Sequence, residues 1–325
     1  MRVLTLPLRC VVLVVTLTAS AFVCAQPYGY SINSRGDFTD DSRVFALWHI
    51  NLANGQEEYI GWTGRGDFVD IEGLAFSSDN RLFGADDSTN TLVRVGTETG
   101  NAIPVGGSSS NMGVPLGTSM DFGLTFSCDG ELLVSAAGTG ELYSADPETG
   151  RLSLKGDLGL PIVDLASVGD TIYGIGLGTD RDGRAAVPNL YRIDPVEVTA
   201  ELIGALGSEA SPYNQAGLAA DSEGKLWAIT DRNRVFGGTD TEAHPSEILQ
   251  IDVETGRASR IAETIVGIES LAIAPPGPCD DSGEREDHDG DSDAEPVPLM
   301  SDAGRWLLVL LLAGLAVFRL RPVQS

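Results

Sequence analysis

The sequence is poor in cationic side chains. It contains 21 lysines and arginines against 47 aspartates and glutamates, which gives a formal net charge of −26 at pH 7. A surface of this sign repels phosphate backbones and argues against nucleic-acid partners. Cations or basic partners are favoured instead, although strong acidity also serves plain solubility in a salty or extracellular medium.

Catalytic signatures are scarce. The 3 histidines, His49, His244 and His288, are too scattered in the chain to form a zinc cluster of familiar spacing. There is no Gly-x-Ser-x-Gly elbow, no His-Glu-x-x-His motif and no phosphate-binding P-loop. These absences disfavour an enzyme, with one alternative left open, namely an enzyme that uses only carboxylates and calcium.

Cysteine is rare, and two of the 4 cysteines fall in a predicted export signal. Residues 1–25 combine a basic start, an apolar run and small residues before a cleavage point, a pattern typical of a signal peptide. Cleavage after Ala25 leaves Cys128 and Cys279 in a compartment where disulfides persist. We expect these two cysteines to form a disulfide.

A repeat dominates the middle of the chain, with a period of about 50 residues, in the range of propeller blades. Each copy has a short apolar strand pattern followed by a turn with aspartate or asparagine and, in most copies, glycine. Such side chains hydrogen-bond their own backbone, and glycine supplies the positive φ that a bulged hairpin needs. The five copies are residues 46–55, 91–100, 141–150, 189–195 and 247–256.

A second motif precedes the last four copies, and it consists of a Gly-Leu-Ala-like strand, a tight turn and another apolar strand. A blade therefore consists of four antiparallel strands. The first copy lacks its opening strand, whereas residues 267–273 form a spare strand near the other end. Pairing of residues 267–273 with residues 28–32 would close the ring and leave no long edge exposed. We predict an all-β, five-bladed β-propeller over residues 26–276, with an open sandwich of irregular strands as the alternative.

The motif pair is clearest at Glu72-Gly-Leu-Ala-Phe76 and at Glu141-Leu-Tyr-Ser-Ala-Asp-Pro-Glu-Thr-Gly150. It resembles the blades of secreted bacterial β-propellers of the NHL-like and phytase-esterase-like groups, over residues 28–275. The resemblance implies the fold. It implies little about activity, because propellers host many unrelated functions.

Acidic residues stand at the predicted top ends of the inner strands, where the long connections of the ring also gather. Ring closure makes Glu72 and Glu269 neighbours across the channel, and two adjacent carboxylates must share a proton or hold a cation. Because Ca²⁺ accepts oxygen ligands, we predict a calcium site there. Alternatively, each acid simply receives backbone N–H groups or water. The acids predicted to line the binding surface are Asp70, Asp86, Asp87, Asp121, Asp164 and Asp231. Of these, Asp86, Asp87 and Asp231 end second strands near the same rim, and a role as turn residues is their alternative.

The C-terminal part of the chain changes composition. Residues 277–298 are too charged and too poor in apolar residues to fold, so they predict a disordered linker. Residues 299–325 contain an apolar run of 13 residues, 306–318, which is shorter than the roughly 20 residues of an unaided transmembrane helix. Arginines follow this short predicted helix, which places the propeller outside the membrane, in agreement with the signal peptide.

This tail resembles the C-terminal sorting tails of the IPTL-CTERM type, which exosortase-like enzymes of Gram-negative bacteria handle. The resemblance implies a sorting enzyme of the inner membrane as partner, transient anchoring and delivery to the cell surface. An anchor that is never cut is the alternative. The residues that match or stand in for the sorting motif are Val297, Pro298, Ser301, Asp302 and Gly304.

Together, these patterns predict an exported, surface-delivered propeller that binds an unidentified extracellular ligand through its acidic top face. The alternative function is a Ca²⁺-dependent hydrolase of an ester, a lactone or a phosphate, with Glu72 and Glu269 holding the ion.

Overall fold

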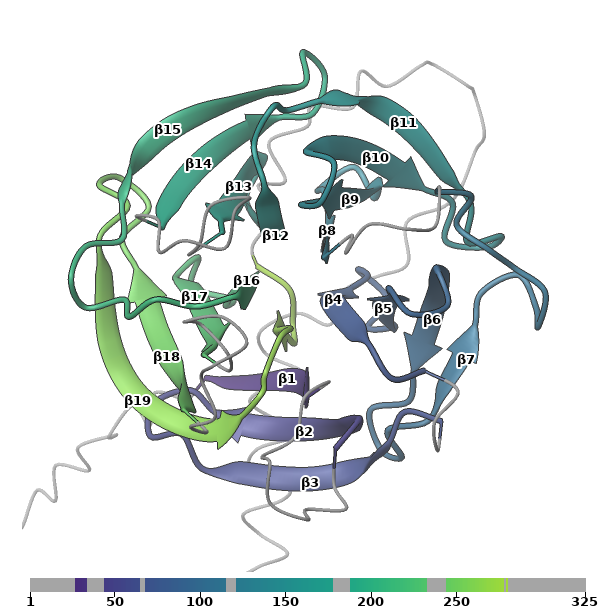
Figure 1. The fold of residues 1–325 in the computed structure, drawn as a ribbon, viewed down its shortest axis with the longest axis horizontal. Helices are drawn as coiled ribbons and strands as arrows, with labels where there is room; N and C mark the ends of the chain where they lie inside the picture. The colour runs from purple at the N-terminus through teal and green to yellow at the C-terminus, as the bar shows by residue number, and fades with distance from the viewer. Residues whose placement is uncertain are drawn as a thin grey trace, which may run out of the picture. The chain divides into compact units, whose positions relative to one another are not determined.

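The computed structural model describes residues 27–33, 44–64, 68–114, 121–177, 188–232, 244–277 and 279. In these residues the regular elements are 20 β-strands, which form five antiparallel sheets of four strands each. Figure 1 shows the sheets arranged as blades around a common centre, which we call the channel. The prediction of an all-β, five-bladed β-propeller is confirmed.

The predicted signal peptide, sorting motif and apolar helix lie outside the described residues, as does the linker apart from residues 277 and 279. Within the described part of the chain, no helix has the length and apolar character needed to cross a membrane.

Each blade runs from an inner strand beside the channel to an outer strand at the rim (Figure 1). The first blade contains β20 (Ala272–Ile273), β1 (Tyr28–Asn33), β2 (Ala46–Asn51) and β3 (Glu57–Trp62). The second contains β4 (Ile71–Phe76), β5 (Leu82–Asp86), β6 (Thr91–Val95) and β7 (Ala102–Pro104). The third contains β8 (Phe122–Phe126), β9 (Leu132–Ala136), β10 (Glu141–Ala145) and β11 (Leu152–Asp157).

The fourth blade contains β12 (Ile162–Val168), β13 (Thr171–Gly176), β14 (Asn189–Asp194) and β15 (Thr199–Ala205). The fifth contains β16 (Gln215–Ala220), β17 (Leu226–Asp231), β18 (Pro245–Ile251) and β19 (Ala258–Val266). The inner strands contact one another around the channel in the order β20, β4, β8, β12 and β16, and β16 returns to β20.

The two ends of the propeller close the ring in one sheet. β20 pairs antiparallel with β1, so that Tyr30 lies opposite Ala272. An isolated bridge joins Asn33 to Ile268 further along the same pair of segments. The first blade thus takes its inner strand from the C-terminal end of the domain, as the missing and spare strands predicted.

The closing strand is shorter than the predicted span of residues 267–273. Only Ala272–Ile273 is a strand, because a side chain replaces part of the ladder. The hydroxyl of Ser270 accepts the backbone N–H of Ile32 at 3.0 Å, a position where a strand would offer a carbonyl.

A disulfide ties the closing segment to the third blade. Cys128 lies in the turn between β8 and β9, and Cys279 follows β20. The predicted disulfide between these two cysteines is present in the structure, with their Cα atoms 5.4 Å apart. Because 151 positions separate them in the chain, the bond closes a very long loop. Such a bond stabilises the fold by limiting the freedom of the unfolded chain.

The repeated turn after the third strand of a blade is built from its aspartate. In the fifth blade, a carboxylate oxygen of Asp252 accepts the backbone N–H groups of Glu254 at 3.0 Å and of Thr255 at 2.8 Å. These hydrogen bonds hold the pKa of Asp252 below its usual value. Gly256 follows with a φ of 74°, which a side chain would disfavour.

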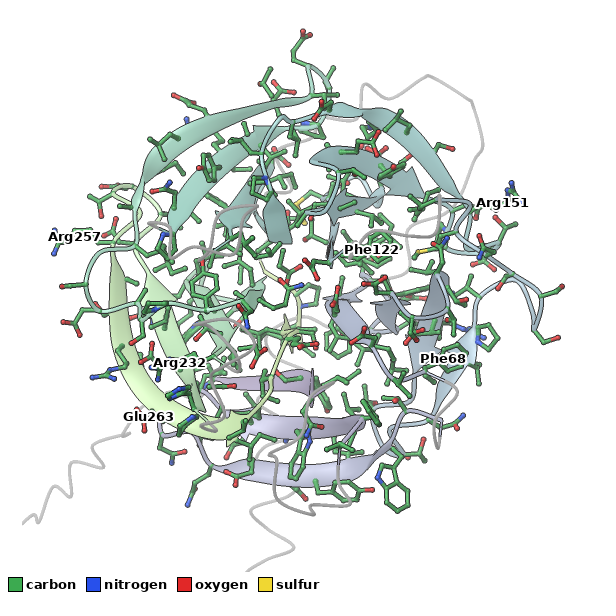
Figure 2. All side chains as sticks on the ribbon, in the orientation of Figure 1. Phe68, Phe122, Arg151, Arg232, Arg257 and Glu263 are labelled. Carbon is green, nitrogen blue, oxygen red and sulfur yellow. A yellow bond between two sulfur atoms is a disulfide. The ribbon has the colours of Figure 1, made fainter. Side chains whose placement is uncertain are left out.

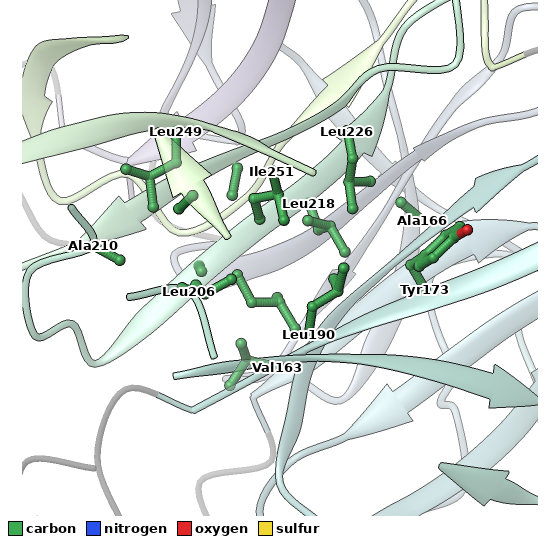
Figure 3. Close-up of a cluster of buried hydrophobic side chains, with 14 of the residues drawn as sticks. Val163, Ala166, Tyr173, Leu190, Leu206, Ala210, Leu218, Leu226, Leu249 and Ile251 are labelled. Atoms are coloured by element: carbon green, nitrogen blue, oxygen red, sulfur yellow. The ribbon is translucent and has the colours of Figure 1, made fainter. Parts of the chain in front are cut away.

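The core lies between adjacent blades. Figure 3 shows such a cluster, in which Val163, Leu190, Leu218 and Leu249 come from the fourth and fifth blades. Each side chain is at most 1 % exposed, so its burial contributes about 1.5–3 kcal/mol before entropy is counted. The apolar faces of neighbouring sheets thus hold the ring together.

At the glycines of β8 and β16, the neighbouring inner segments approach too closely for a side chain. A Cβ added to Gly123 on β8 would lie 2.3 Å from the Cα of Asp164 on β12. A Cβ on Gly217 of β16 would lie 2.2 Å from the carbonyl carbon of Ser270. The glycine of the Gly-Leu-Ala motif is therefore required by the narrow centre of the ring.

Candidate functional site

Five acidic residues gather at one end of the channel, where the inner strands of the first three blades begin. Asp70 directly precedes β4 and Glu72 lies within it. Asp87 follows β5, Asp121 precedes β8, and Glu269 precedes β20. Two overlapping groups of carboxylates form among them. We call these five residues the mouth cluster.

Glu72 is the residue common to both groups. One carboxylate oxygen from each of Asp70, Glu72 and Glu269 lies within 4.8 Å of the others. The same limit holds for the group formed by Glu72, Asp87 and Asp121. The predicted proximity of Glu72 and Glu269 across the ring closure is thus present in the structure.

The two glutamates are deeply buried, since Glu72 is 3 % exposed and Glu269 is 2 % exposed. One oxygen of Glu72 accepts the backbone N–H of Phe122 at 3.0 Å, which fixes the carboxylate against the third blade. Figure 2 places Phe122 near the centre of the ring. The glutamate therefore spans from the second blade to the third at the end of the channel.

The pKa of Glu72 is raised well above its usual value. Burial is the largest cause, and the negative charges of Asp121, Glu269, Asp70 and Asp87 add to it in that order. A carboxylate in this position either takes up a proton or receives a cation. Each outcome reduces the repulsion within the mouth cluster.

The donor set of the mouth cluster suits a hard cation. Both groups consist of carboxylates alone, with neither the imidazole nor the thiolate ligands that zinc sites prefer. In a calcium site each oxygen lies about 2.4 Å from the ion, so oxygens on opposite sides lie about 5 Å apart. The limit of 4.8 Å within each group is compatible with this size.

Asp86, also predicted on the binding surface, is turned inward and belongs to neither group. One of its oxygens accepts the backbone N–H of Asp70 at 2.9 Å. The other accepts the backbone N–H of Thr89 at 2.8 Å and the hydroxyl of Ser88 at 2.7 Å. Asp86 is thus a turn residue that holds the backbone of Asp70 in place.

Asp164 occupies the position that glycine takes in the neighbouring inner strands, and it is fully buried. One oxygen accepts the N–H groups of Leu124 and Leu165, each at 2.9 Å, and the other accepts that of Leu218 at 2.6 Å. Burial raises the pKa of Asp164, and these three N–H groups oppose the shift. Asp164 joins three blades through their backbones and lies in neither carboxylate group.

Asp231, the last acid predicted for the binding surface, also lies outside the two groups. It ends β17 opposite Gln215 of β16 and is fully buried. The structure therefore brings together five of the eight acids predicted for the top face, and the other three are buried elsewhere in the blades.

The buried carboxylate of Glu247 was not predicted from the sequence. Glu247 of β18 is 0 % exposed and forms ion pairs with Arg232 at 3.2 Å and Arg260 at 3.1 Å. Its carboxylate also accepts the hydroxyl of Ser211 at 2.8 Å. The sequence gives only a weak signal, because Glu247 lies in a strand that also contains the polar residues Ser246 and Gln250.

Comparisons with known proteins give no family. No protein-family model matches the chain, and no curated protein matches it.

Solved structures of low similarity exist. Hydrazine synthase of Kuenenia stuttgartiensis matches this chain with a TM-score of 0.37 and 13% sequence identity. The match covers 66% of this chain and 59% of the hydrazine synthase chain, so this chain spans less than two thirds of that protein. Selenomethionine-substituted virginiamycin B lyase of Staphylococcus aureus has a TM-score of 0.38 and 12% identity over 72% of this chain and 69% of its own. A catalytically inactive variant of that lyase with quinupristin has a TM-score of 0.38 and 12% identity, over 73% and 71%. At such low scores, nothing about this chain is inferred from these proteins.

Proposed function

We propose that the protein is an exported β-propeller that binds Ca²⁺ in the mouth cluster and uses this acidic face to bind an extracellular ligand. The observation that carries the proposal is that Glu72 is common to two groups of three carboxylates. Such a concentration of negative charge at a buried position favours a divalent cation.

The bound ion would also allow the acidic face to recognise a ligand. Ca²⁺ takes six to eight oxygen ligands, and part of its coordination can come from water or from a bound molecule. A ligand that carries carboxylate, hydroxyl or carbonyl oxygens would complete the coordination. The propeller then supplies a rigid frame, and binding takes place at one end of its channel.

Calorimetric titration of the metal-free, full-length protein with Ca²⁺ tests the proposal. We expect saturable binding that weakens by at least about tenfold in Glu72→Gln and in Glu269→Gln, since each variant removes a buried ligand charge. Glu57→Gln is the matched control, because Glu57 is an exposed acid on β3. Equal affinity in all four proteins would contradict the proposal.

A calcium-dependent hydrolase is the second candidate, and the raised pKa of Glu72 favours it. A carboxyl group with a raised pKa can act as a general acid or base beside an ion that polarises a carbonyl or phosphoryl oxygen. Ester, lactone and phosphate substrates, assayed before and after chelation, separate this candidate from a binding module. Activity that is lost on chelation and in Glu72→Gln would establish an enzyme.

We further propose that the chain is exported and delivered to the cell surface of a Gram-negative bacterium by an inner-membrane sorting enzyme. The support comes from the sequence patterns at residues 1–25 and 297–304. Mass spectrometry of the surface protein should find an N-terminus at Gln26 and no peptide from the apolar run. Pro298→Ala should leave the tail attached, and an intact tail in the unchanged protein would contradict sorting.

A further inference from the structure

A pocket lies on the side of the ring, between the first and second blades, and none of the mouth-cluster residues lines it. It has a volume of about 280 Å³. Strands β1, β2 and β3 and the turn between β6 and β7 contribute its walls. The lining includes Tyr30, His49, Glu58, Tyr59, Thr97 and Glu98.

The register of the first blade places three of these side chains in a row. Tyr30 lies opposite His49 on the neighbouring strand, and His49 lies opposite Glu58 on the next. Residues that pair directly in a sheet project from the same face. The row faces the second blade, since the ring of Tyr30 contacts that of Phe76 at 5.5 Å.

The aromatic part of the wall is held in place by ring contacts. The His49 ring stacks on Tyr28 with centroids 4.7 Å apart and lies 4.8 Å from the ring of Tyr30. Ring faces carry negative potential and attract organic cations. Burial lowers the pKa of His49, and Glu58 opposes this shift, so the ring is largely neutral at neutral pH and does not repel a cation.

The same pocket carries two carboxylates. Glu58 and Glu98 line it beside Tyr30, His49 and Tyr59. Burial raises the pKa of Tyr30, and the negative charges of these two acids raise it further. Both glutamates are exposed. Among the residues that the structure describes, neither forms an ion pair. The lining combines ring faces with two negative charges and contains neither lysine nor arginine.

We propose that this side pocket binds an alkylammonium group, with the ammonium between Glu58 and Glu98 and the alkyl chain along the rings of Tyr30 and His49. Aromatic rings and carboxylates together favour such a cation over a neutral or anionic ligand. The group could belong to a free amine or to a lysine side chain, because both carry the same chemistry.

Calorimetric titration of the full-length protein in the presence of a chelator tests the inference. The probes are n-pentylammonium for a free amine, Nα-acetyl-lysine amide for a lysine side chain, and 1-pentanol as the neutral control. We expect saturable binding of at least one cation, with a Kd of roughly 1 mM, and no measurable binding of the alcohol. Binding of the lysine derivative alone identifies a protein or peptide source, and binding of n-pentylammonium alone identifies a free amine.

Two sets of variants locate the site. Glu58→Gln with Glu98→Gln should weaken binding at least about tenfold, and Tyr30→Leu about fivefold. Glu57→Gln with Glu254→Gln removes two exposed acids elsewhere and should change binding less than about twofold. Unchanged thermal unfolding of the glutamate variants would show that the fold is intact.

Three results would overturn the inference. The first is the absence of saturable binding of either cation, and the second is equal binding of 1-pentanol. The third is an equal loss in the two pairs of glutamate variants, or a loss that follows Glu269→Gln instead. The last variant separates this pocket from the mouth cluster, so the two proposals can fail independently.

Discussion

The carboxylate of Asp164 on β12 accepts the backbone N–H of Leu218 on β16 at 2.6 Å, across the boundary between the fourth and fifth blades. Its other oxygen accepts the N–H of Leu124 on β8 at 2.9 Å. A single buried side chain thus connects the inner strands of three consecutive blades. It stands where the neighbouring blades have glycine, and its backbone lies so close to β8 that a Cβ on Gly123 would lie 2.3 Å from its Cα atom.

Replacement of Asp164 by asparagine should destabilise the propeller. Both oxygens of the aspartate accept backbone N–H groups, so an amide in the same place must turn its NH₂ toward at least one of them. A buried donor that faces another donor costs about 1–3 kcal/mol, which urea denaturation would measure. Asp170→Asn is the matched control, since Asp170 is exposed in the following turn. Equal stability of the two variants would contradict the role given to Asp164.

The stability of the metal-free protein should depend on the ionisation of Glu72. Its pKa is raised in the folded state above its ordinary value of 4.5. The folded protein therefore binds more protons than the unfolded chain, and stability falls as pH rises from about 4.5 through the raised pKa. Thermal unfolding in a chelator should show a decreasing Tm over this range, and Glu72→Gln should reduce that decrease.

Calcium should reverse the same pH dependence. The ion binds the ionised mouth cluster, so its addition should raise Tm more at pH 8 than at pH 5. Glu57→Gln should behave as the unchanged protein does, because it removes an exposed charge. An equal rise at both pH values, or an equal rise in Glu72→Gln, would show that Ca²⁺ acts elsewhere.

The disulfide between Cys128 and Cys279 should contribute measurably to stability. It joins residues 151 positions apart, and removal of such a bond costs about 2–5 kcal/mol. We expect replacement of both cysteines by serine to lower the free energy of unfolding by this amount, measured by urea denaturation. Reduction of the unchanged protein should reproduce the effect. A non-reducing peptide map in which both cysteines are free thiols would contradict the pairing.

The ring and the closeness of Glu72 to Glu269 could be predicted because they depend only on counting strands. One strand is missing at the start of the repeated region and one is spare at its end, so the spare strand can complete the incomplete blade. Once residues 28–32 and 267–273 share a sheet, the start of the closing strand must lie beside the second blade.

The direction of individual acids could not be predicted in this way. Asp86 and Asp87 are adjacent in the sequence, yet their side chains have different roles. The carboxylate of Asp86 accepts hydrogen bonds within a turn, whereas that of Asp87 belongs to the mouth cluster. Asp164 carried a visible signal, since it replaces the glycine of the inner-strand motif. The role of its side chain, however, depends on its contacts with β8 and β16, and the sequence of one repeat does not reveal these contacts.

Glu247 shows most clearly why side-chain partners could not be predicted from the sequence. Its partners Ser211, Arg232 and Arg260 come from three separate segments of the chain. Figure 2 shows Arg232 and Glu263 on the side of the ring formed by β18 and β19. The Glu247 side chain is 0 % exposed and that of Arg232 is 19 % exposed, so their ion pair is largely shielded from water. Arg260 is 46 % exposed and adds less.

Replacement of Glu247 by glutamine should therefore destabilise the fifth blade mainly through Arg232. The variant leaves a largely buried guanidinium without its carboxylate, and loss of one partner of such a pair costs about 2–4 kcal/mol after allowance for the exposed arginine. Glu263→Gln is a close control, because Glu263 contacts the same Arg260 at 3.7 Å but is 52 % exposed. Its expected change is below about 0.5 kcal/mol. Urea denaturation of both variants measures the two losses in free energy of unfolding. Similar losses would mean that the buried ion pair contributes no more than a surface contact.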